Sequence, residues 1–143
     1  MNKQFNAIMS LSDEEKIAYL CAFTRLAKTD GRFDDIEKQY IQSIAKQYDV
    51  PSTRIEEIFE KHSDDEILKN LSKIKNRRVA LELIKDLCFL AHVDDELSDE
   101  ETLFIGRVGQ AMNVELEKIE QISSWVIERI ISEEEAKLIF DEI

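Results

Sequence analysis

Residues that interrupt regular structure are scarce in this sequence. Its 143 residues include three glycines and one proline, which leaves little material for tight turns. The abundant residues, among them leucine, alanine, glutamate and lysine, are good helix formers. No segment shows sustained alternation of apolar and polar residues, so we expect no strands. The sequence therefore predicts an all-α fold, and its length suits one domain spanning residues 1–143.

Long apolar runs and positive charge are also in short supply. No apolar stretch approaches the roughly 18 residues of a membrane span, and no secretory signal precedes the first predicted helix, so we expect no direct membrane insertion. The 19 basic residues are outnumbered by 31 acidic ones, which gives a net charge of −12. Such a surface repels phosphate backbones and therefore argues against nucleic acid as a partner. It suits divalent cations or a basic protein partner.

Cysteine is limited to Cys21 and Cys88, each within an apolar run. We expect both to be reduced core residues, because free cysteine behaves as a small hydrophobic side chain. The sequence has no CxxC pair, no phosphate-binding glycine loop and no nucleophile elbow. These features favour a reduced, cytoplasmic protein that is not an enzyme, with an enzyme using paired carboxylates as the least favoured alternative.

A shift of 64 residues aligns the chain with itself. The paired residues include Leu26 with Leu90, Asp30 with Asp94, Asp35 with Asp99, and Glu37 with Glu101. Repeats of this kind indicate that one structural unit occurs twice. We therefore predict two units, about Ile17–Phe59 and Leu81–Ser123, related by an internal pseudo-two-fold axis.

Apolar residues at steps of three and four predict three helices in each unit. Further helices are expected over roughly Lys3–Met9, after Ser63 and at the end of the chain. The sequence thus predicts a compact bundle of about nine helices. We expect Tyr40 to belong to a buried stripe, and Trp125 and Phe140 to pack the C-terminal helices into the core.

Two acidic stretches, Ala27–Lys38 and Ala91–Thr102, occupy matching places in the two units. In each, a capping residue (Asp34 or Ser98) is followed three residues later by a glutamate, which is the pattern of a helix N-cap. The same pattern occurs at three other predicted helix starts, where we expect no site: Ser12, Ser63 and Ser132. One interpretation of the acidic stretches is therefore that they only begin helices.

Capping does not explain Asp30 and Asp94, which precede the caps at predicted helix ends, where the helix dipole mildly disfavours an acid. Asp35 and Asp99 also recur without belonging to the capping pattern. Both stretches match the second half of the twelve-residue calcium loop but lack its ligands at positions 1 and 3, so neither is a standard EF-hand. Three interpretations stay open: a divalent-cation site, solvated caps, and an acidic docking patch for a basic partner.

The stretch LAKTDGRFDDIEKQYIQSIA resembles the first unit of domains similar to tellurite-resistance protein B (TerB), and LAHVDDELSDEETLFIGRVGQAMNV resembles the second. The shared signature is an alanine, an Asp-Gly pair, an apolar residue, and a glutamate six residues after the glycine. The second unit departs from it at Asp95, where glycine is expected. The resemblance covers about Leu11–Trp125.

This resemblance implies an all-helical, pseudo-symmetric fold and a divalent-cation site formed by both acidic turns. The ligands that it implies are Asp30, Glu37, Asp94 and Glu101, supported by Asp35 and Asp99. Because these are oxygen donors, the expected cation is Ca²⁺ or Mg²⁺. The resemblance also implies a role in resistance to tellurite and other stresses, exerted through protein partners that include membrane-associated complexes.

Two further features are ambiguous. His92 is expected to complement the end of its helix, with cation binding as the alternative. The basic segment Lys73–Arg78 is expected to be a solvated connector, with partner docking as the alternative.

Overall fold

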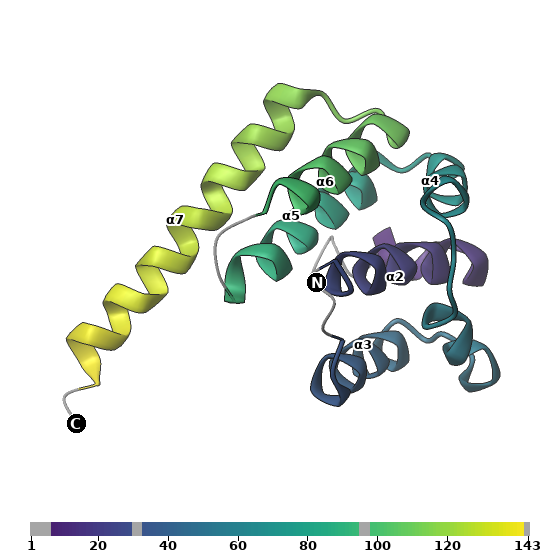
Figure 1. Cartoon of the computed structure of the whole chain (residues 1–143), viewed down its shortest axis with the longest axis horizontal. Helices are drawn as coiled ribbons and strands as arrows, with labels where there is room; N and C mark the ends of the chain where they lie inside the picture. Colours follow the sequence, from purple (N-terminus) through teal and green to yellow (C-terminus); the bar gives the residue numbers. More distant parts are fainter. Residues whose placement is uncertain (1–6, 30–32, 95–97, 142–143) are drawn as a thin grey trace.

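The regular structure of the computed structural model is helical (Figure 1). The structure describes residues 7–29, 33–94 and 98–141, with only the backbone for residues 93–94, and these ranges contain no strand. The prediction of an all-α fold is confirmed. In the same ranges, no helix has the length and apolar character needed to cross a membrane.

Seven elements follow one another along the chain after a short helical segment at residues 7–9. They are α2 (Asp13–Ala27), α3 (Asp35–Gln47), the 3₁₀ helix η1 (Ser52–Ile58), α4 (Asp64–Ser72), α5 (Arg77–Asp94), α6 (Asp99–Ala111) and α7 (Leu116–Phe140).

Two of the predicted helix starts outside the acidic stretches are confirmed. At the start of α2, the Glu15 N–H donates to Ser12 Oγ at 3.2 Å, and the Ser12 N–H donates to Glu15 Oε1 at 2.9 Å. At the start of α4, the Glu66 N–H donates to Ser63 Oγ at 3.1 Å. Each cap satisfies a backbone donor that has no partner within its helix and contributes about 1 kcal/mol.

The prediction that a helix begins after Ser132 is wrong, because α7 continues through this residue. Neither glycine nor proline occurs among the 25 residues of α7, so nothing in the chain stops the helix between Leu116 and Ser132. A capping pattern within an unbroken helix leaves the serine as an ordinary interior residue. One helix therefore replaces two predicted ones, and the expected count of about nine is not confirmed.

Helix α2 lies at the centre of the core, where it packs against α3, α4, α5 and η1. Eleven of its 15 residues are buried, as expected for a helix that is apolar on almost every side. Tyr19, which is 1% exposed, donates its hydroxyl hydrogen to Asp86 of α5 at 2.6 Å. Desolvation raises the pKa of Asp86 above its usual value, while the hydrogen bond from Tyr19 opposes this effect. The pair fixes α5 against α2.

Several local features recur 64 residues apart. Helices α3 and α6 have 13 residues each and begin at this spacing. Each is followed by a residue in the left-handed region, Asp49 with φ 61° and Asn113 with φ 59°. The next N–H, of Val50 or Val114, donates to a carbonyl five residues earlier at 3.0 or 2.8 Å, which is the Schellman arrangement. The pseudo-two-fold symmetry of the whole fold stays a prediction.

Much of the apolar surface of α7 is exposed, although the helix packs against α5 and α6. Phe140 is 78% exposed, so the prediction that it packs into the core is wrong. Trp125 is 47% exposed, but its ring lies edge-on to Phe89 of α5 with the ring centres 6.1 Å apart, so it packs α7 against α5 without being buried. Tyr40 of α3, predicted to be buried, is 58% exposed. The C-terminal end of α7 lies clear of the other helices (Figure 1). Periodicity identifies the apolar face of a helix, but it does not show whether another part of the fold covers that face.

Arg25 connects three helices at the edge of the core. Its Nε and one Nη donate to the two carboxylate oxygens of Asp64 in α4 at 2.6 and 3.2 Å. Its guanidinium carbon lies 5.1 Å from the centre of the Phe104 ring in α6. A bidentate, stacked arginine restricts both the position and the orientation of its partners.

We expect Arg25→Ala to lower the free energy of unfolding by about 1–2 kcal/mol, because it removes a half-buried ion pair and a cation–π contact together. Urea denaturation measures this change. Arg107→Ala, at an exposed arginine of α6, is the matched control and should change the value by less than about 0.5 kcal/mol. Equal stability of the two variants would contradict the role given to Arg25.

Cys21 and Cys88 are both free and buried, which confirms that they are core residues. Burial raises the pKa of Cys21 to about 12 and that of Cys88 to about 11. Because the thiolate is the reactive form, we expect neither cysteine to react with a chromogenic disulfide reagent at pH 8 until the protein unfolds. Absorbance should then report both thiols in denaturant. Fast reaction of either cysteine in the native protein would contradict this expectation.

Candidate functional site

Both acidic turns lead directly into helices, and their carboxylates take part in the helix starts. The Glu37 N–H donates to Asp34 Oδ1 at 2.8 Å where α3 begins. The Glu101 N–H donates to Ser98 Oγ at 3.1 Å where α6 begins, and the Ser98 N–H donates to Glu101 Oε1 at 3.1 Å. The predicted caps at Asp34 and Ser98 are therefore confirmed.

Capping and cation binding do not exclude each other at Glu101. The capping hydrogen bond is made to Oε1, and an ionised carboxylate has two oxygens with several acceptor positions. A helix start that carries acids in its first turn is also stabilised by the helix dipole. Glu101 therefore fits both interpretations.

The start of α3 shares a cavity with the last turns of α5, and the start of α6 shares another with the residues that follow α2. Glu37 of α3 lines a cavity of about 640 Å³ together with Phe89 and Leu90 of α5. Glu100 of α6 lines a second cavity, of about 460 Å³, together with Lys28 and Thr29, which follow α2. Each acidic helix start thus lines a cavity together with the helix end that leads into the other acidic turn. This crossed arrangement was not predictable from either turn alone.

Two of the four predicted ligands belong to the described part of the chain. Glu37 and Glu101 lie in the first turns of α3 and α6 and are partly buried. Asp30 and the side chain of Asp94 lie outside the described residues. The structure thus places one glutamate from each turn.

The supporting acids, Asp35 and Asp99, begin α3 and α6 and are exposed. Within the residues whose side chains the structure describes, no group of three or more histidine, cysteine or acidic residues is placed to hold a metal ion. A complete cation site at these turns therefore has to include at least one of the acids whose side chains lie outside the described residues, which are Asp30, Asp94, Asp95 and Glu96.

His92 lies near the end of α5, two residues before Asp94. Its Nε2 is buried and has no hydrogen-bond partner in the described part of the chain. An unpaired buried polar atom costs about 1–3 kcal/mol, and an imidazole nitrogen is a common metal ligand. His92, to which the sequence assigned only a minor role, is thus a candidate ligand beside the second turn.

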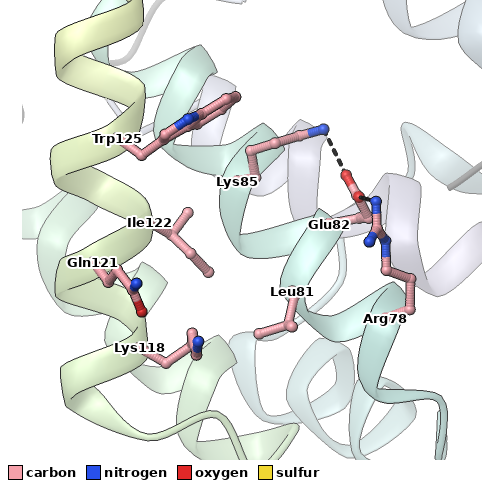
Figure 2. A pocket seen from close by; sticks show the side chains of 8 residues that line it. All are labelled: Arg78, Leu81, Glu82, Lys85, Lys118, Gln121, Ile122 and Trp125. Atoms are coloured by element: carbon pink, nitrogen blue, oxygen red, sulfur yellow. Dashed lines mark ion pairs between the residues drawn. The ribbon is translucent and has the colours of Figure 1, made fainter.

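A surface hollow of about 310 Å³ is lined by both α5 and α7 (Figure 2). Each helix lines it with four residues at positions i, i+3, i+4 and i+7, which is one helix face. The lining residues are Arg78, Leu81, Glu82 and Lys85 from α5, and Lys118, Gln121, Ile122 and Trp125 from α7.

The hollow is basic, although the chain is acidic. Glu82, whose side chain is 7% exposed, lies 2.7 Å from Arg78 and also forms an ion pair with Lys85. With Lys118, three cations and one carboxylate line the hollow, which leaves an excess of two positive charges. The sequence alone does not predict this surface, because its cations come from two helices that are distant in the chain. The spacing of Arg78, Glu82 and Lys85 on one helix face was the signal available.

Comparison with known protein families identifies the chain. The family model described as Tellurite resistance protein TerB matches residues 16–124, which is more than half of the chain and includes both acidic turns. Searches of curated proteins and of solved structures give no match. The resemblance inferred from the two acidic stretches is confirmed, and the chain belongs to the TerB family of tellurite-resistance proteins.

Proposed function

We propose that this protein is a non-enzymatic, cytoplasmic stress-response protein that binds Ca²⁺ or Mg²⁺ through its two acidic turns and acts through protein partners. The observation that carries the proposal is the crossed arrangement of Glu37 beside the end of α5 and Glu100 beside the end of α2. Asp30 follows α2 after two residues, and Asp94 is the last residue of α5. Acids from both units therefore belong to neighbouring segments.

Electrostatics supports a cation shared by the two turns. Two carboxylates about 4 Å apart repel each other by roughly 4 kcal/mol at an effective dielectric constant near 20. The predicted ligand set consists of oxygen donors, which suit hard cations. A cation would also offset the unfavourable position of Asp30 and Asp94 at the negative ends of two helix dipoles. Asp95 supplies a further carboxylate at the place where the family signature has glycine.

The matched caps, lengths and ends of α3 and α6 support the further proposal that the fold contains an internal duplication with a pseudo-two-fold axis. Under this proposal the two turns are equivalent halves of one site. A half-site holds too few acids to bind a cation tightly, because Ca²⁺ takes about six to eight oxygen ligands. Loss of either half should therefore affect the whole site.

A metal-free interaction module is the alternative function, and the net charge of −12 is the observation that favours it. In that case the acidic turns dock a basic partner directly. Binding would weaken with salt, because screening reduces attraction between exposed charges, and it would be indifferent to a chelator. Cation-dependent partner binding separates the main proposal from this alternative.

Calorimetric titration of the metal-stripped protein with Ca²⁺, Mg²⁺ and Mn²⁺ tests the cation site. We expect wild-type binding that Asp30→Asn and Asp94→Asn each weaken about tenfold or more, since each variant removes a charged ligand worth at least about 1.4 kcal/mol. Both variants keep the caps at Asp34 and Ser98.

Asp65→Asn is the matched control, because Asp65 is an exposed acid in the first turn of α4, where the sequence predicts no site. This variant should bind cations as the wild type does. No heat of binding with any of the three cations at millimolar concentration would exclude the proposal, and so would an equal loss of affinity in the control.

A further inference from the structure

The surface hollow lined by α5 and α7 has an apolar floor. The floor consists of Leu81, Ile122 and Trp125, and Figure 2 shows Leu81 and Ile122 pointing toward each other from the two helices. Trp125 packs edge-on against Phe89 but remains 47% exposed. An exposed tryptophan beside other apolar side chains is typical of the centre of a protein interface.

The rim of the hollow is cationic and consists of Arg78, Lys85 and Lys118. Glu82 is 6% exposed and forms ion pairs with the first two of these cations. A carboxylate this deeply buried has to remain paired, so it holds both cations at the edge of the hollow. The Arg78 side chain is nevertheless 52% exposed, and a guanidinium has more N–H donors than one carboxylate oxygen can accept. The rim can therefore also donate to an anion from outside.

The neighbouring ion pairs leave the hollow positive. Asp86 lies 3.8 Å from Lys85, but its other oxygen accepts the hydrogen bond of Tyr19 in the core. Two adjacent pairs bring one charge of each sign, and they are Arg77 with Glu115 and Arg129 with Glu133. Even with Asp86 counted beside Glu82, the three rim cations leave an excess of one positive charge among the described residues. The hollow is thus a positive region on a chain with a net charge of −12.

These features restrict what can occupy the hollow. The net charge of the chain repels nucleic acid and anionic lipid surfaces. A free anion would contact the rim but leave the apolar floor in water. A protein segment can cover the floor with an apolar side chain and bring carboxylates to the rim. A hollow of about 310 Å³ has room for a large apolar side chain.

We propose that this hollow docks an acidic segment of a partner protein, with an apolar side chain of the partner on the floor and carboxylates on the rim. The rim cations come from both helices (Figure 2), so the segment that fits best has acids before and after its apolar residue. This inference rests on the part of the proposed function in which the protein acts through partners. It does not involve the cation site.

Selection from a phage-displayed library of random peptides, in buffer that contains a chelator, tests the proposal. An acidic protein attracts basic peptides through its overall charge, so acidic peptides are enriched only if a local basic site binds them. We expect the enriched peptides to carry an aromatic or large aliphatic residue between acids. Enrichment of basic peptides alone would overturn the proposal, and so would the absence of any enriched peptide.

Fluorescence locates the binding site, because Trp125 is the only tryptophan of the chain. A synthetic form of the most enriched acidic peptide should change this fluorescence until the hollow is saturated. We expect Lys118→Gln and Gln121→Glu each to weaken binding about threefold or more. The first removes a rim cation, and the second adds an acid of equal size inside the hollow.

Lys137→Gln and Gln110→Glu are the matched controls, because they make the same two changes at exposed positions outside the hollow. Both should bind the peptide as the wild type does. Equal weakening in a variant and its control would mean that only the overall charge matters and would overturn the proposal. Displacement of the peptide by inorganic phosphate or acetate at a similar concentration would mean that the hollow takes a free anion, with the same consequence.

The docking surface and the cation site can fail separately. Neither Lys118→Gln nor Gln121→Glu changes an acid of the two turns, and the calorimetric titration of the cation site uses no peptide. We expect both variants to bind cations as the wild type does. Loss of the docking surface therefore leaves the proposed cation site unaffected, and peptide binding in the presence of a chelator does not depend on that site.

Discussion

The burial of α2 on almost every side is the constraint on which the rest of this structure depends. Four elements pack against it, so each has to present an apolar face and pair its polar groups at the contact. The hydroxyl of Tyr19 is paired with Asp86, and Arg25 reaches from the edge of α2 to Asp64 and Phe104. These contacts also fix the end of α2, from which the first acidic turn departs. The position of the candidate site is thus a consequence of core packing.

Helix ends explain why a pair of acidic turns suits a cation. The starts of α3 and α6 attract acids. Asp34 caps α3, and Glu101 accepts a hydrogen bond from the Ser98 N–H at the start of α6. The ends of α2 and α5 repel acids, yet each leads into an aspartate of the family signature. Each of these helix starts lines a cavity together with the helix end of the other unit. Acids that the helix dipole stabilises and acids that it destabilises therefore belong to segments that meet at the same cavities. A cation shared by both kinds of acid would replace their mutual repulsion with attraction to the cation.

Local patterns predicted the helices and most of their starts, because caps and apolar periodicity depend on neighbours within a few residues. The same locality explains the errors. Ser132 has the pattern of a cap, but it can cap a helix only if the preceding helix ends before it, and α7 does not end there. Tyr40, Trp125 and Phe140 are apolar at helical spacing, but their burial depends on a neighbour that the pattern cannot supply. The basic hollow could be predicted only by knowing that α5 packs against α7. No local sequence pattern contains this information.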